Sequence, residues 1–124
     1  MTEPESTLAA RIAVIRQEYL ARLHDESLPK LRALRQRFAE TPQDDEVRKQ
    51  LLHAAHDMTG SGAVFGFDAV SADGRRLEDA LRAAIKQSGD IAGERLSDLL
   101  ALADRLIETC AATAAHRAAP GNPG

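Results

Sequence analysis

Apolar residues recur at helical spacing along most of this 124-residue chain, and no other feature of the sequence limits the fold so strongly. One such stripe has members three or four residues apart, namely Val47, Leu51, Ala54 and Met58. This spacing places the four side chains on one face of a helix. No stretch of the sequence alternates apolar and polar residues as a half-buried strand does, and no segment repeats. The pattern therefore predicts an all-α protein.

Capping residues and a proline divide the N-terminal third into two predicted helices. A residue of the pair Ser6–Thr7 can cap the first helix, which we expect to run to about His24. Pro29 lacks an amide hydrogen and is tolerated in the first turn of a helix but not in its interior. We therefore expect a break near Asp25 and a second helix that is capped by Ser27.

The remaining sequence predicts three more helices with short connections. Thr41–Pro42 has the arrangement of a cap followed by proline at the first helical position, so the third helix should begin there. It should end near Phe65, because Gly66 accepts the left-handed conformation that ends a helix. Asp68 can cap the fourth helix, and a connection this short makes the third and fourth helices antiparallel neighbours. A fifth helix follows Ser88–Asp90.

Composition indicates what fills the core and which partners are excluded. Only 3% of the residues are aromatic, so aliphatic side chains must fill the core, and this favours closely packed helices. The formal net charge is −3 and there is no lysine- or arginine-rich run, so we expect no nucleic-acid partner. The single cysteine, Cys110, falls on the apolar stripe of the last helix and is predicted to be buried. No apolar run approaches about 18 residues, so we expect no membrane span and a cytoplasmic protein.

Two histidines and three glycines lie within the stretch Leu51–Phe67. Glycine in a helix interior costs about 0.5–1 kcal/mol relative to alanine, so such a group of glycines indicates close packing or a need for access. On a helical wheel His56 lies roughly 170° from the centre of the apolar stripe and points outward. The residues on or near the same face are Lys49, Leu52, His53, Gly60 and Ala63. An open patch around a projecting imidazole suits docking by a macromolecule better than binding of a small ligand.

The run from His56 to Phe67, followed by Leu77 and Glu78, resembles the signature of the histidine phosphotransfer (HPt) domain family. That family has His-x-x-Lys-Gly-Ser, then a small residue and an apolar turn that contains glycine. The likeness is strongest over Leu51–Leu81 and is compatible in length with nearly the whole chain.

The resemblance implies an all-α, antiparallel four-helix bundle of the HPt type, here with an additional N-terminal helix. We expect the bundle over residues 1–117 and a flexible tail over residues 118–124, which are rich in proline and glycine. One departure from the family pattern is plain, since Thr59 stands where the family commonly has lysine or arginine.

The resemblance further implies that His56 accepts a phosphoryl group and passes it to or from the aspartate of a receiver domain. The chain would then be a phosphoryl carrier and not an enzyme, with a receiver domain or a histidine kinase as its partner. We expect a monomer that holds no cofactor or metal, with Mg²⁺ in the partner's active site. The supporting or docking residues are expected to be Lys49, Leu52, His53, Thr59, Gly60 and Ala63. The source of the positive charge that lysine would supply is left open, with Lys49 on a nearby turn as one candidate.

Other readings of the same residues carry less weight. His53 and His56 could hold a metal, but two ligands leave the site incomplete. The glycines between Gly60 and Gly66 follow a helix and not a strand, so they do not form a dinucleotide-binding motif. The main alternative is a degenerate HPt-like bundle that binds and regulates a kinase or receiver without being phosphorylated.

Overall fold

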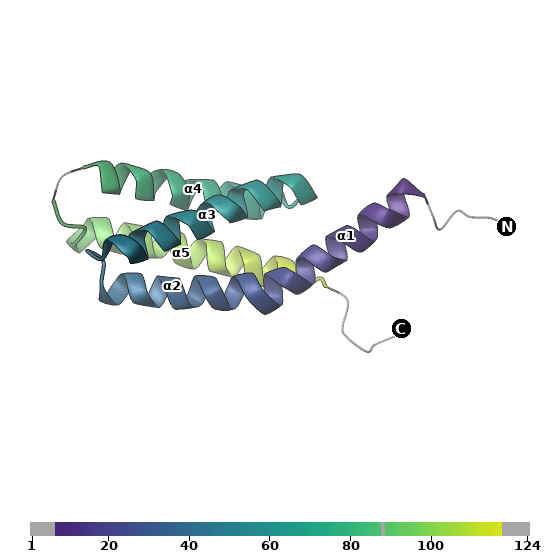
Figure 1. Cartoon of the computed structure of the whole chain (residues 1–124), viewed down its shortest axis with the longest axis horizontal. Helices are drawn as coiled ribbons and strands as arrows, with labels where there is room; N and C mark the ends of the chain where they lie inside the picture. Colours follow the sequence, from purple (N-terminus) through teal and green to yellow (C-terminus); the bar gives the residue numbers. More distant parts are fainter. Residues whose placement is uncertain (1–6, 88, 118–124) are drawn as a thin grey trace.

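The computed structural model describes residues 7–87 and 89–117, and these residues contain helices and no strand. The elements are α1 (Leu8–Arg22), the π turn η2 (Leu23–Ser27), α2 (Leu28–Glu40), α3 (Asp45–Phe65), α4 (Asp68–Lys86) and α5 (Gly93–Ala114). Helices α2 to α5 pack lengthwise as a bundle, and α1, joined end to end to α2, bends away from it and extends past one end of the bundle (Figure 1). Residues 118–124, which the sequence predicts to be a tail, and Ser6 lie outside the described residues.

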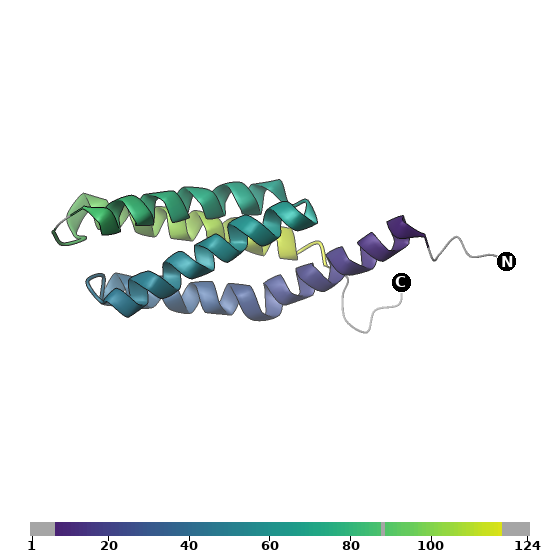
Figure 2. The ribbon, with the colours of Figure 1, turned by 45° about the horizontal axis from the view of Figure 1, so that its top comes forward.

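The predicted break near Asp25 is wrong, because α1 runs into α2 through η2 without leaving helical geometry (Figure 2). Ser27 has helical dihedral angles of −68° and −44° and caps nothing with its side chain. The amide of Leu28 donates to the carbonyl of Leu23, five residues earlier, as a π turn requires. Pro29 lacks an amide hydrogen and its ring crowds the carbonyl four residues before it, and the wider turn accommodates both constraints. A separate N-terminal helix is therefore not confirmed.

The first part of α1 is exposed, although apolar residues follow helical spacing along it. Tyr19 is buried, but the residues earlier on the same stripe are exposed, because α1 extends past the end of the bundle. These exposed residues are Leu8, Ile12 and Ile15. The Tyr19 ring stacks on Phe65 and Phe67 at centroid distances of 4.7 and 5.4 Å. This contact attaches the end of α1 to the turn between α3 and α4.

Capping signals predict the end of α3 correctly but not its start. The predicted start at Thr41–Pro42 is wrong, since Asp44 caps the helix by accepting hydrogen bonds from two amides of its first turn. Thr41 instead ends α2 and donates its hydroxyl to the carbonyl of Arg37. The predicted end is confirmed, with Gly66 in the left-handed conformation at φ 82°. Helix α4 begins two residues later, so α3 and α4 are antiparallel neighbours (Figure 1).

The core is aliphatic, as the composition predicts. The predicted stripe of α3 is buried throughout; its members are Val47, Leu51, Ala54 and Met58. Cys110 is also buried, and burial, together with the nearby charge of Asp73, raises the pKa of its thiol to about 12. Because thiolate is the reactive form, this cysteine is an inert core residue.

Two glycines let α3 and α4 approach closely. A Cβ added at Gly62 would lie 2.7 Å from the backbone nitrogen of Ser71, and one at Gly74 would lie 2.8 Å from the backbone nitrogen of Thr59. A Cβ at Gly60, by contrast, would meet nothing within 4 Å. The glycines of the signature therefore have two different roles: Gly62 permits close packing, whereas Gly60 leaves space at the surface.

This difference predicts opposite effects of the same substitution two residues apart. Gly62→Ala should destabilise the fold by about 1–3 kcal/mol, because backbone atoms of α4 must move. Gly60→Ala should leave stability unchanged or raise it by up to about 1 kcal/mol, because alanine favours the helix and meets no neighbour. Urea unfolding followed by circular dichroism measures both. Equal effects of the two substitutions would contradict the assigned roles.

Candidate functional site

His56 projects from the outward face of α3, as its place on the helical wheel predicts. Its side chain is 62% exposed. Of the residues expected on the same face, four are exposed, namely Lys49, His53, Gly60 and Ala63. Leu52 is partly buried and packs against the core.

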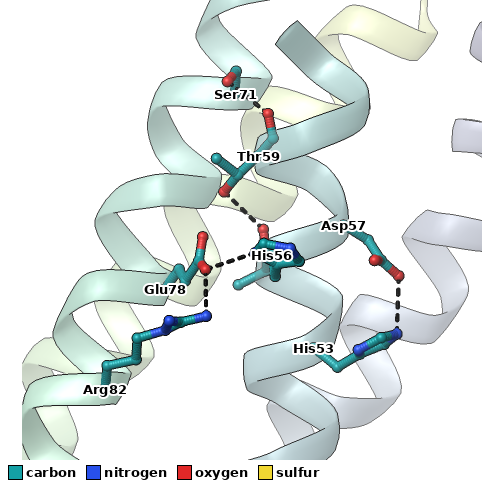
Figure 3. A network of polar contacts seen from close by, with 8 residues as sticks. His53, His56, Asp57, Thr59, Ser71, Glu78 and Arg82 are labelled. Carbon is teal, nitrogen blue, oxygen red and sulfur yellow. Dashed lines mark hydrogen bonds and ion pairs between the residues drawn. The ribbon is translucent and has the colours of Figure 1, made fainter. Parts of the chain in front are cut away.

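The imidazole of His56 is held from α4. Its Nδ1 lies 2.7 Å from Oε2 of Glu78, whose side chain is only 9% exposed. A terminal nitrogen of Arg82, one turn further along α4, donates to the same carboxylate oxygen at 2.7 Å (Figure 3). The sequence placed Glu78 within the signature without assigning it a role, and it gave no reason to select Arg82. The i, i+4 spacing of Glu78 and Arg82 on one helix is the signal that could have paired them.

The charge of Glu78 determines which nitrogen of the ring is free. Burial alone would raise the pKa of Glu78. The hydrogen bond from His56, the nearby Thr59 hydroxyl, and then the charges of His56 and Arg82 outweigh burial and hold this pKa below its ordinary value of 4.5. Glu78 is therefore a carboxylate near neutral pH, and a carboxylate only accepts hydrogen bonds. Nδ1 therefore carries a hydrogen and donates it to Glu78, so in the neutral ring Nε2 is the nitrogen with the free lone pair.

Thr59, which the resemblance includes among the supporting or docking residues, lies between α3 and α4. Its side chain is buried against α4, and its hydroxyl lies near Glu78 and donates to the carbonyl of Ala55 at 2.9 Å (Figure 3). Its own carbonyl accepts a hydrogen bond from the Ser71 hydroxyl at 2.7 Å. A helical wheel could not show this position, because it locates the outward face but not the side on which α4 approaches. Thr59 is part of the contact between the two helices.

An open hollow of about 400 Å³ lies beside His56, between α3 and the end of α1. The residues that line it are Tyr19, Arg22, Ser27, His56, Asp57, Met58, Gly60 and Ser61. The Tyr19 hydroxyl hydrogen-bonds to Ser61 at 2.9 Å and fixes the inner wall. The expected space beside the imidazole is therefore present, although one of its walls belongs to α1, which the sequence did not associate with the site.

Lys49 and His53 line a different depression, together with Lys30, Glu46 and Gln50. His53 also lies 3.5 Å from Asp57, one turn along the same helix (Figure 3). Neither Lys49 nor His53 lines the hollow beside His56. Among the described residues, no group of three or more His, Cys, Asp or Glu side chains gathers closely enough to hold a metal ion.

Comparison with known proteins adds one positive finding. A family model described as the Hpt domain matches residues 18–116, which include both α3 and α4. Searches of the curated proteins and of the solved structures found no match. Within the described part of the chain, no helix combines the length and apolar character that a membrane-spanning segment needs.

The charge of Glu78 predicts how stability depends on pH. Its lowered pKa means that the folded state favours the carboxylate, so its contribution to stability is present above pH 4.5 and is lost as pH falls through the folded value. The stability of the wild type should therefore fall towards that of Glu78→Gln as pH is lowered from 4.5 through the folded-state pKa of Glu78. Urea unfolding at a series of pH values measures this difference. A constant difference across the acid range would contradict the assignment.

Proposed function

Since the chain belongs to the Hpt domain family, we propose that it is a histidine-containing phosphotransfer protein of a two-component phosphorelay. In this proposal His56 accepts a phosphoryl group and passes it to or from the aspartate of a receiver domain. The observation that carries the proposal is the state of the ring: Nδ1 is held by a buried carboxylate, while the ring itself is exposed beside an open hollow.

This arrangement suits nucleophilic attack on phosphorus. The lone pair of His56 Nε2 attacks the phosphorus of an aspartyl phosphate in line, and an N–P bond forms. The P–O bond to the aspartate breaks, and its electron pair leaves with the carboxylate. Positive charge develops on the ring, and Glu78 stabilises it through the hydrogen bond from Nδ1–H, as a carboxylate does for a catalytic histidine elsewhere. Transfer to a receiver is the reverse of these steps.

The carboxylates near His56 favour a phosphoryl carrier over a complete enzyme, because neither is free to hold a metal ion. The two nearest carboxylates are already engaged, since Glu78 binds His56 and Arg82 and Asp57 faces His53. Phosphoryl transfer needs cations on the phosphoryl oxygens, and Mg²⁺ commonly supplies this charge. We therefore expect Mg²⁺ to come from the partner, a receiver domain or a histidine kinase.

The acceptor assignment predicts where label appears. Receiver domains from the same genome, loaded with acetyl phosphate, should transfer phosphate to the wild-type chain, and mass spectrometry should locate it on His56 as an acid-labile modification. His56→Gln should abolish the label, and His53→Gln is the matched control that should retain it. Label on His53 would show that the acceptor is wrong. If no receiver transfers phosphate but one still binds, the alternative of a non-phosphorylated regulator would replace the proposal.

The positioning role of Glu78 predicts a change in which nitrogen reacts. Glu78→Ala frees both ring nitrogens, so phosphate should appear on Nδ1 as well as Nε2, with transfer slowed by up to about 10²-fold. Glu78→Gln can still accept from Nδ1–H through its amide oxygen, so it should keep phosphate on Nε2 while slowing transfer less.

Phosphorus NMR distinguishes the two phosphohistidine isomers and measures this outcome. Arg82→Ala is the control, because it removes the outer ion pair but leaves the carboxylate on His56. A single isomer in Glu78→Ala would mean that Glu78 does not select the reacting nitrogen.

A further inference from the structure

A phosphoryl group on His56 would bring negative charge and strong acceptor oxygens to the surface of α3, and oxygens of this kind bind best to guanidinium groups. Most arginine side chains with contacts in the described residues are already used as hydrogen-bond donors. These are Arg35, Arg37, Arg48, Arg76, Arg82 and Arg117. Binding of a phosphoryl group on His56 therefore needs a nearby cation that is not already used as a donor.

Arg22 meets this requirement. It is the last residue of α1 and lines the same hollow as His56. Within the described residues its side chain has no hydrogen bond and no ion pair, and its guanidinium carbon lies 5.9 Å from the centre of the Tyr19 ring. The side chain is exposed, so its guanidinium can turn from the aromatic ring towards an anion in the hollow.

The structure also keeps the space between Arg22 and His56 open. Gly60 lines the hollow one turn beyond His56, and a Cβ at that position would meet nothing within 4 Å. Tyr19 is fixed by its stacking on the aromatic residues of the turn and by its hydrogen bond to Ser61. Because Arg22 follows Tyr19 by less than one turn on the same helix, these contacts also fix the backbone that carries Arg22.

Other cations are less well placed. Lys49 lines a separate depression with His53 and not the hollow beside His56. Arg82 is already bound to Glu78, and Thr59 is buried and uncharged. The carboxylate of Asp57 lines the same hollow as Arg22 and would repel an anion, so the hollow needs a cation if it is to hold one.

We propose that Arg22 binds the phosphoryl group carried on His56 by donating its guanidinium hydrogens to the phosphoryl oxygens. The inference rests on the proposed function, since it requires His56 to be the acceptor. It assigns α1 a direct part in the chemistry: the helix that extends past the bundle supplies the positive charge that α3 lacks at Thr59.

The test uses the full chain and a small phosphoryl donor, so that no partner protein contributes. Potassium phosphoramidate phosphorylates imidazole nitrogen with release of ammonia, and phosphorus NMR follows the rate. Arg22→Ala should slow the reaction about tenfold. This is less than the effect of removing a hydrogen-bond donor from a fully enclosed active site, because the hollow is open to water. Arg22→Lys should restore part of the rate.

Arg11→Ala is the matched control and should leave the rate unchanged. Arg11 lies on the same face of α1 about three helical turns before Arg22, so its removal changes the net charge equally but not the hollow. Circular dichroism of each variant checks the fold. Equal slowing in Arg22→Ala and Arg11→Ala would mean a general effect of charge and would overturn the proposal. A third variant, Lys49→Ala, tests the other nearby cation, and slowing confined to it would also overturn the proposal.

Contact is read directly from the Nε–Hε signal of Arg22 in a nitrogen–proton correlation spectrum, identified by its loss in Arg22→Lys. This signal should move downfield when the wild type is phosphorylated and stay in place in His56→Gln. An unmoved signal with normal phosphorylation of His56 would overturn the role of Arg22 alone. A wild-type chain that takes no phosphate on His56 would overturn the proposed function as well.

Discussion

The hydrogen bond from His56 to Glu78 joins two helices, and the candidate site depends on it. Its length of 2.7 Å requires α3 and α4 to lie close together, and Gly62 and Gly74 permit that approach because neither carries a Cβ into the facing backbone. The buried carboxylate stays ionised because His56 and Arg82 face it. The packing of the two helices and the orientation of the ring are thus consequences of one arrangement, in which a charge buried on α4 holds an exposed group on α3.

The other wall of the site comes from the beginning of the chain. The π turn at Leu23–Ser27 lets the helical chain pass Pro29 without breaking, so α1 is joined to α2 at an angle and reaches past the bundle. Tyr19 then fastens α1 to the turn after α3 by stacking on Phe65 and Phe67. The hollow beside His56 exists because α1 is continuous with α2 and is fastened close to this histidine. A surface built in this way is open to solvent while its walls are held by packing.

Much of the fold and part of the site could be predicted from local patterns. The stripe that includes Leu51 and Met58 is buried, and Gly66 ends α3 in the left-handed conformation, because both features depend on spacing and backbone sterics alone. The prediction of a break near Asp25 is wrong, because a wider turn can also accommodate a proline. Whether the helix breaks or widens depends on what α1 and α2 pack against. The burial of Thr59 could not be predicted for a similar reason, since a wheel shows which side faces the core but not where the next helix crosses.

By itself, the sequence determined that the chain is helical, that His56 points away from the core, and that its signature resembles that of the HPt family. These properties follow from residue order within single helices. Tertiary structure alone decided that Glu78 holds Nδ1, that Gly62 and Gly60 have opposite roles, and that Arg22 shares a hollow with His56. The physical reason is that hydrogen bonds and charges act over a few ångströms, and residues 22 to 34 positions apart in sequence come within that range only after the helices pack.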